Sequence, residues 1–121
     1  MRVIGVEPTG APSLTRALSE GQVTALSSVQ TIADGLAAPF AGDLTLELAR
    51  RCVDEVVLVS DQEIAEALGL VLERTKLQVE PGGAAGIAAL LQRRGGLREG
   101  ARVVAVLSGG NVDRARLKEL L

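Results

Sequence analysis

The sequence of 121 residues contains no histidine, tyrosine or tryptophan, and Phe40 is its only aromatic residue. The lack of histidine excludes a serine–histidine–aspartate triad and the histidine-containing zinc sites. The lack of a row of aromatic side chains excludes recognition of nucleic acid by stacking on its bases. A single cysteine, Cys52, excludes an internal disulfide and leads us to expect a cytoplasmic protein, kept in a reducing compartment.

Charge and hydropathy narrow the possible partners further. The formal net charge is −2, so we expect no general attraction to nucleic acid or to an anionic membrane. No apolar run approaches the roughly 18–20 residues that a membrane-spanning helix needs. A strand-like segment directly after Met1 argues against a secretory leader. With 47% hydrophobic residues the chain can form one modest core, and we expect a single domain over residues 1–121.

Short apolar runs alternate along the chain with segments of helical periodicity. Because these runs are apolar on both faces, they predict parallel strands buried between helices. The expected fold class is therefore α/β, with three layers and a small, mostly parallel sheet flanked by helices. The expected strands are residues 3–6, 56–59 and 102–107, and the expected helices are residues 13–20, 43–52, 61–75, 81 to about 94, and 113–121.

Several residues are expected to begin these helices. Ser60 and Glu63 form a capping-box pair at the start of the third expected helix. Ser13 and Asp43 are expected as simple caps of the first two helices. The residues of the second helix that we expect to face the core are Leu44, Leu48 and Ala49.

Polar or glycine-rich segments follow the expected strands and the brief extended stretch of residues 76–80, at the edge of a parallel sheet where ligands bind. They begin at Glu7, Ser60, Glu80 and Ser108. Two of them, residues 80–83 and 108–111, are rich in glycine and precede helices, where free backbone N–H groups favour an anion. The alternative is that these glycines only allow tight turns between strand and helix.

Three side chains near these segments each have two interpretations. Ser108 could bond a ring nitrogen of a ligand, or it could cap the last helix in place of Asn111 or Asp113. Glu80 could be a surface carboxylate, or it could be buried, in which case it needs a partner. Lys76, one of two lysines, is expected to be solvated.

Four segments occur in an order and at a spacing that resemble one enzyme family. They resemble the C-terminal part of threonine dehydratases and serine racemases, which are fold-type-II enzymes that use pyridoxal phosphate (PLP). The resemblance implies that the chain is part of the large domain of a tryptophan-synthase-β-like PLP enzyme. The segments are TIADGLA (31–37), VDEVVLVSDQEIAEAL (53–68), ERTKLQVEPGGAAGIAAL (73–90) and VVAVLSGGNVD (103–113), preceded by VIGVEP (3–8).

The resemblance implies roles for three residues at the cofactor. Ser108 would bond the pyridine nitrogen of PLP, Gly35 would lie against the face of the cofactor, and Glu80 would stand beside it. A neutral hydroxyl at the ring nitrogen leaves that nitrogen unprotonated, which suits elimination of a β-hydroxyl.

The same resemblance implies a cation, a substrate and an assembly. Glu7 and the carbonyl of Ala11 match positions that bind a divalent cation, although Ser13 stands where a second carboxylate is expected. The substrate would be a small amino acid, L-serine or L-threonine. The intact enzyme would be a homo-oligomer.

In the implied reaction the hydroxyl of the amino acid is eliminated, and hydrolysis then gives a 2-oxo acid and ammonia. In this family the Schiff-base lysine and the phosphate-binding loop lie in an N-terminal part, and neither matches a residue here. We therefore expect this chain to be inactive alone and to need that part as its partner. The alternative is a non-catalytic oligomerisation or interaction domain of the same lineage. A dinucleotide-binding domain is disfavoured, because no G-x-G-x-x-G follows the first expected strand.

Overall fold

The computed structural model describes all 121 residues. Its two strands, β1 (Ile4–Pro8) and β2 (Glu55–Val59), pair in parallel. Parallel strands need a crossover connection, and residues 9–54 provide it. The helical elements are α1 (Ser13–Glu20), the short 3-10 helix η1 (Asp34–Leu36), α2 (Asp43–Cys52), α3 (Asp61–Thr75), α4 (Pro81–Leu91) and α5 (Arg114–Leu120).

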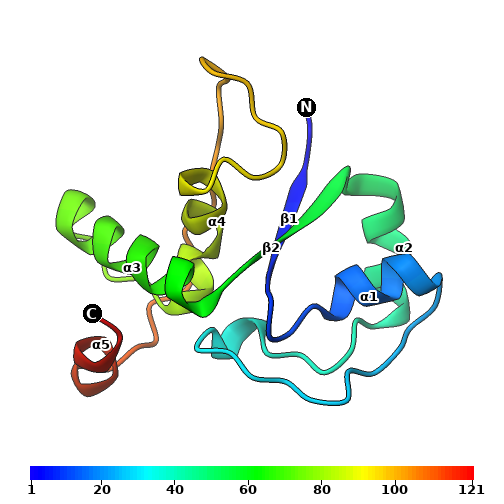
Figure 1. Cartoon of the computed structure of the whole chain (residues 1–121), viewed down its shortest axis with the longest axis horizontal. Helices are drawn as coiled ribbons and strands as arrows, with labels where there is room; N and C mark the ends of the chain where they lie inside the picture. Colours follow the sequence, from blue (N-terminus) through cyan, green and yellow to red (C-terminus); the bar gives the residue numbers. More distant parts are fainter.

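The strands lie between two layers of helices. In Figure 1, α1 and α2 are on one side of the strands, and α3 and α4 are on the other. The larger core is on the side of α3 and α4, where Val59, Ile64, Leu68, Ala84 and Ala88 are almost completely buried. This arrangement confirms the predicted α/β class with its helical layers around a small parallel sheet, which here has two strands.

Local sequence signals explain where the main helices begin and end. The capping box at α3 is confirmed, because Ser60 Oγ accepts from the Glu63 N–H at 3.2 Å and Glu63 Oε2 accepts from the Ser60 N–H at 2.6 Å. Pro81 occupies the first position of α4, where its missing N–H removes no helical hydrogen bond. Gly21 ends α1 in a left-handed conformation with φ of 73°.

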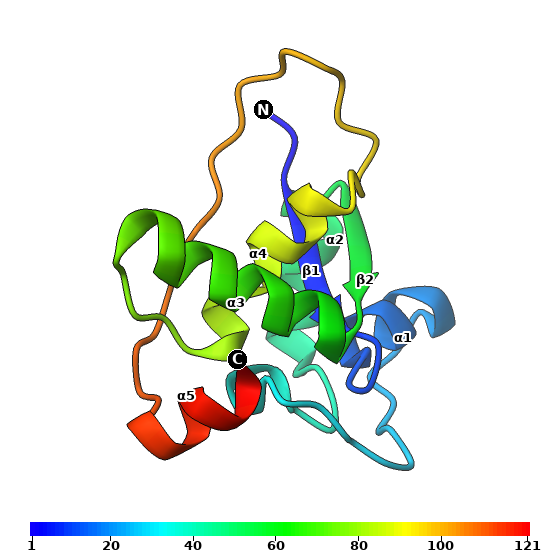
Figure 2. The ribbon, with the colours of Figure 1, turned by 60° about the vertical axis from the view of Figure 1, so that its left-hand side comes forward.

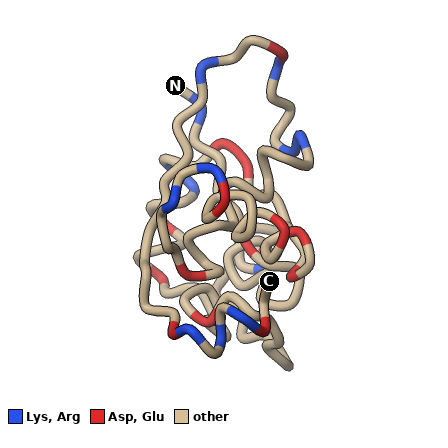
Figure 3. Tube along the Cα trace, turned by 90° about the vertical axis from the view of Figure 1, so that its left-hand side faces the viewer, with Lys and Arg blue, Asp and Glu red and all other residues tan.

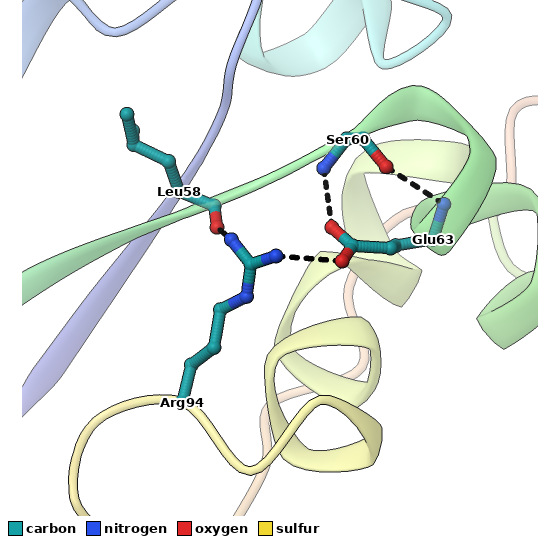
Figure 4. A network of polar contacts seen from close by, with 4 residues as sticks. All are labelled: Leu58, Ser60, Glu63 and Arg94. Carbon is teal, nitrogen blue, oxygen red and sulfur yellow. Dashed lines mark hydrogen bonds and ion pairs between the residues drawn. The ribbon is translucent and has the colours of Figure 1, made fainter.

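Arg94 ties the loop that follows α4 to the junction of β2 and α3. Residues 92–102 carry four arginines and one glutamate, and they form the arch at the top of Figure 3. Arg94 turns inward from this arch: its guanidinium donates to the Leu58 carbonyl and, at 2.6 Å, to Glu63 Oε1 (Figure 4). One carboxylate therefore holds both the start of α3 and the loop after α4.

These contacts favour the charged form of Glu63. The N–H of Ser60 is the largest cause that lowers its pKa, the charge of Arg94 lowers it further, and partial burial opposes both. Folding therefore weakens proton binding at this carboxyl. The resulting stability is complete above the ordinary glutamate pKa, and it is lost as the pH falls through the lowered value.

Glu63→Gln should reduce the free energy of unfolding by about 1–3 kcal/mol at neutral pH, because it removes a charge-assisted contact to a half-buried arginine. Urea unfolding at a series of pH values measures this difference, which should shrink as the pH falls below that of the Glu63 titration. Glu66→Gln, on an exposed position of the same helix, is the matched control and should have little effect. Equal losses for the two variants would contradict the assigned role of Glu63.

The third predicted strand is wrong as a strand. Residues 102–107 form an extended segment, and none of them takes part in a backbone–backbone hydrogen bond. The segment runs past α4 in Figure 2 and lies against that helix rather than beside β1 or β2. Its side chains are largely exposed, with Val104 at 93% and Val106 at 75%. The segment has the amino-acid composition of a strand, but no other strand of the structure lies beside it to pair with it.

The predicted inner face of α2 is also wrong at two positions. Leu44 and Leu48 are exposed to 68% and 48%, whereas Leu46 and Ala49 are buried. Leu46 packs in a small second core with Ala17 of α1. The sequence of α2 alone is compatible with two apolar faces. The packing of α1 against one of them determines that Leu46 and Ala49, rather than Leu44 and Leu48, are buried.

The caps of α1 and α2 differ from the prediction by one residue. Ser13 and Asp43 are the first residues of their helices, and Pro12 and Gly42 hold the N-cap positions without a side-chain cap bond. The N–H groups at the start of α1 are satisfied by a residue from outside the helix, described below.

The C-terminal region corrects one further expectation and decides between the alternatives left open for the cap of the last helix. Helix α4 ends at Leu91, earlier than predicted, and the chain then turns through residues with positive φ at Arg93, Gly95 and Gly96. The cap of α5 is Asp113, whose side chain accepts from the Arg116 N–H at 2.8 Å. Of the three residues considered for this cap, the structure selects Asp113.

No helix combines the length and the hydropathy that a membrane-spanning segment requires.

Candidate functional site

Three segments meet around the side chain of Glu80, which precedes α4. A Cβ built on Gly35 would lie 3.1 Å from Glu80 Oε1, and a Cβ built on Gly109 would overlap the same carboxyl group. The backbone N–H of Glu80 donates to the Gly109 carbonyl at 3.2 Å. The carboxylate therefore fits between two residues that have no side chain, and the structure brings together the regions of Gly35, Glu80 and Ser108 that the sequence singled out.

The backbone after residue 107 approaches α4 closely because Gly83 has no side chain. A Cβ built on Gly83 would overlap the carbonyl oxygen of Ser108, and it would lie 3.2 Å from the backbone nitrogen of Ser108. Ser108 itself is exposed. This contact fixes how closely the backbone after Ser108 approaches the first turn of α4.

A pocket of about 260 Å³ opens beside Glu80. Gly35, Glu80 and Gly82 line one part of it, and Asn111 and Arg116 line another. Ser108 does not line this pocket. The pocket carries acidic, basic and amide groups together, and its walls come from η1, the start of α4 and the segment that leads into α5.

The start of α4 offers few free donors for an anion. Pro81 has no N–H, the Gly83 N–H donates to the Glu80 carbonyl at 2.9 Å, and the carboxylate of Glu80 stands close to Gly82. A negative side chain at this helix end repels an anion. The geometry therefore favours the interpretation of residues 80–83 as a tight turn.

Asp61 fixes the loop that leads to Gly35, a role that the sequence interpretation missed. Its Oδ1 accepts from Thr31 Oγ1 at 2.5 Å, and its Oδ2 accepts from the Ile32 N–H at 3.1 Å. Thr31 Oγ1 in turn accepts from the Ala33 N–H at 3.1 Å, and Ala33 is completely buried. An acidic residue directly after the capping-box serine was the only available signal, and it does not identify so distant a partner.

Glu7 and Ala11 both take part in the start of α1. Glu7 Oε1 accepts from the Leu14 N–H at 2.7 Å, and Oε2 accepts from the N–H and hydroxyl of Thr15 at 2.8 and 2.7 Å. The Ala11 carbonyl accepts from the Ser13 N–H at 3.0 Å. No group of three histidine, cysteine, aspartate or glutamate residues is placed to hold a metal ion. The divalent cation at Glu7 and Ala11 stays a prediction.

Lys76 is exposed and ends α3. It adopts a left-handed conformation with φ of 64°, and its Nζ donates to the Glu73 carbonyl at 2.6 Å. This is the solvated arrangement that the sequence predicted for Lys76.

Residues 1–109 match the protein family described as pyridoxal-phosphate dependent enzyme. The chain is 48% identical over 113 residues to an L-threonine ammonia-lyase of Geobacter sulfurreducens, covering 93% of this chain and 28% of that protein. It is 38% identical over 125 residues to a serine racemase of Oryza sativa, covering 100% of this chain and 37% of that protein. The chain thus spans about a third of the length of these curated relatives.

Solved structures show the same fold. The processed form of threonine deaminase isoform 2 from Solanum lycopersicum superimposes with a TM-score of 0.89 at 34% identity, covering 99% of this chain and 35% of that one. Maize serine racemase gives a TM-score of 0.86 at 38% identity, covering 98% of this chain and 38% of that one.

Gly109→Ala should destabilise the protein more than Gly100→Ala. Both glycines have positive φ, of 69° and 77°, so both substitutions carry the same backbone strain of about 1 kcal/mol. Gly100 has open space around its Cα, whereas Gly109 faces the Glu80 carboxyl. Urea unfolding of the two variants measures the excess. In a Glu80→Ala background the excess should disappear, and its persistence would mean that Glu80 is not the group being displaced.

Asp61→Asn should loosen the loop before Gly35 without unfolding α3. The amide cannot accept hydrogen bonds with both of its terminal atoms, so exchange of the Ile32 and Ala33 backbone amides should become about tenfold faster or more. Hydrogen exchange followed by NMR measures this. Asp43→Asn is the control, because Asp43 is the first residue of α2 but is exposed. Unchanged protection at Ile32 would contradict the assigned role of Asp61.

Proposed function

The chain belongs to the family of pyridoxal-phosphate dependent enzymes, and from this we propose that it forms the C-terminal part of an L-threonine or L-serine dehydratase. The family match covers residues 1–109, and the identity to an L-threonine ammonia-lyase is 48% over 113 residues. The observation that carries the proposal is that Gly35, Glu80 and the backbone at residues 108–109 lie close together, since Gly35, Glu80 and Ser108 are the residues expected at a cofactor.

We propose that a flat heterocycle binds at this site. Gly35 and Gly109 present bare backbone beside Glu80, and a side chain at either position would crowd the Glu80 carboxyl. Ser108 is exposed and supplies a neutral hydroxyl, which can hydrogen-bond a ring nitrogen without charging it. Bound there, PLP would supply the electron sink for removal of an α-proton. We propose that Ser108 orients the ring and that Glu80, held by the Gly109 carbonyl, fixes the polar contacts at its edge.

The proposed reaction converts L-threonine or L-serine to a 2-oxo acid and ammonia. The α-proton and the β-hydroxyl leave as water, and a second water molecule releases ammonia, so the overall change is deamination. Proton transfer at the α-carbon needs a lysine amine close to the substrate. The amine of Lys76 donates a hydrogen bond to the Glu73 carbonyl of α3, and we do not propose it as this lysine. We therefore propose that the chain is inactive alone and that an N-terminal part supplies the lysine and the phosphate loop.

The extended segment of residues 102–107 is the proposed site of contact with that part. Its backbone N–H and C=O groups make no backbone hydrogen bonds, and Val104 and Val106 are among the most exposed apolar side chains of the protein. A strand from the N-terminal part could pair with this segment and bury its side chains, which would remove an edge that isolated proteins avoid. We also propose that the intact enzyme is a homo-oligomer in the cytoplasm. A divalent cation bound by Glu7 and the carbonyl of Ala11 is a further part of the proposal.

A complementation experiment tests the proposal. The chain is mixed with an N-terminal part of the Geobacter sulfurreducens L-threonine ammonia-lyase and PLP, and release of 2-oxo acid from L-threonine and L-serine is measured. Activity should require both polypeptides. Failure of the two to associate would contradict the proposal, and association without activity would instead favour the non-catalytic interaction domain.

Two variants locate the contributions of this chain. Val104→Asp should weaken association with the N-terminal part, whereas Phe40→Asp, at a residue that is 53% exposed elsewhere, should not. Ser108→Ala should preserve association and lower kcat about tenfold, the effect of one lost hydrogen bond of roughly 1.4 kcal/mol in the transition state. An unchanged kcat in Ser108→Ala would contradict the proposal that the Ser108 hydroxyl contacts the cofactor ring.

A further inference from the structure

The loop after α4 is anchored at its base to both strands. This loop, residues 92–102, is the arch of Figure 3. A Cβ built on the buried Gly95 would lie 2.5 Å from Ile4 Cδ1, so the base of the arch packs directly on β1. The guanidinium of Arg2 donates to the Gly95 carbonyl at 3.1 Å, and Arg94 reaches the end of β2. The base of the arch is therefore fixed before any ligand binds, which lowers the entropy cost of binding.

A pocket of about 260 Å³ opens where the arch meets the end of α4. It is separate from the pocket beside Glu80, which lies at the first turn of α4. The helix has 11 residues, so its two ends are about 16 Å apart. The volume is slightly below the roughly 300–1,000 Å³ of pockets for drug-sized ligands, which indicates a smaller ligand. The walls combine apolar with charged side chains, namely Leu90, Leu97 and Val103 with Arg93, Arg98 and Glu99.

Arg93 and Arg98 both line this pocket, and neither guanidinium has a partner in the protein. No ion pair and no hydrogen bond from an arginine side chain includes either of them. Arg93 also has a left-handed backbone with φ of 53°, which is strained in a residue that carries a Cβ. Strained residues are concentrated at ligand sites. Two guanidinium charges without counter-ions thus stand at one small concavity, where they can bind one anion.

The end of α4 does not cancel this attraction. Carbonyl groups at the C-terminus of a helix carry partial negative charge, which repels an anion when they are free. Here the carbonyls of Ala88, Ala89 and Leu90 accept from the backbone N–H groups of residues 92–94. The turn into the arch therefore occupies these acceptors, and the two guanidinium groups dominate the charge of the pocket.

The lining of the pocket indicates the chemistry of the anion. Two positive side chains and one negative side chain give a local charge of +1, which a single negative charge neutralises. Guanidinium groups bind carboxylates through paired N–H donors. The apolar walls favour a hydrocarbon chain, which inorganic phosphate lacks, and a phosphate dianion would exceed the local charge. A monocarboxylate with a short aliphatic chain matches all of these features.

We propose that the pocket between the arch and the end of α4 binds a small aliphatic monocarboxylate. Arg93 and Arg98 hold the carboxylate, and Leu90, Leu97 and Val103 cover its hydrocarbon chain. The inference goes beyond the proposed function and does not rest on it, because no residue of the cofactor site takes part. It is testable on this chain without PLP and without an N-terminal part.

The first test is a titration with sodium butanoate followed by the NMR shifts of the backbone amides. The shifts should saturate in residues 90–103 and stay unchanged in residues 31–37, beside Glu80. Sodium phosphate should bind about tenfold more weakly or less, because it buries no hydrocarbon. 1-Butanol, which has the same chain length without the charge, should give no saturation. Equal affinities for butanoate and phosphate, or butanoate shifts that never saturate, would overturn the proposal.

The second test uses variants of the arch. Arg98→Gln should weaken butanoate binding about tenfold or more, through loss of a charge-assisted hydrogen bond. Arg102→Gln, in the same arch but outside the lining of the pocket, is the matched control and should bind butanoate like the wild type. Equal losses in these two variants would overturn the proposed site.

Arg93→Gly separates binding from folding. Glycine adopts the left-handed conformation of residue 93 without strain, so the variant should unfold at the same urea concentration as the wild type. Its affinity for butanoate should nevertheless fall about tenfold or more, because one guanidinium is lost. Unchanged butanoate binding in a folded Arg93→Gly variant would show that the Arg93 guanidinium does not hold the carboxylate, and would overturn the proposal.

Discussion

The contact between Gly83 and the Ser108 carbonyl is the constraint on which the candidate site depends. A side chain at Gly83 would lift the chain away from α4, and Gly109 would then no longer meet Glu80. The hydrogen bond from the Glu80 N–H to the Gly109 carbonyl fixes the same approach from the other side. Backbone therefore packs directly on backbone here, and the functional groups are positioned by the absence of side chains more than by their presence.

A second set of contacts keeps this region attached to the sheet. Glu63 joins the capping box of α3 to Arg94, and Arg94 reaches the end of β2 (Figure 4). Asp61, two residues earlier, holds the loop before Gly35. The first turn of α3 thus organises two loops that are more than 25 residues away in the sequence, through charged side chains whose buried atoms all have partners.

Local signals were sufficient to predict the fold class and most helices. The Ser60–Glu63 box, Pro81 and Gly21 act over three or four residues, so the sequence around them determines the outcome. Tertiary neighbours decided the remainder. Residues 102–107 have the composition of a strand but no strand beside them. The choice between the two apolar faces of α2 depends on α1. The bonds of Asp61 to residues 31 and 32 connect distant segments, and no spacing in the sequence encodes them. The resemblance to PLP enzymes named the cofactor residues, but their contact with a cofactor remains a prediction.

The unpaired segment of residues 102–107 has a consequence for the fate of this polypeptide in a cell. Chaperones and proteases bind extended apolar stretches whose backbone groups are free, and they compete with productive assembly for the same stretch. We therefore expect the abundance of the chain to depend on how quickly Val104 and Val106 are covered after synthesis, and any surplus of uncovered chain to be degraded or to aggregate.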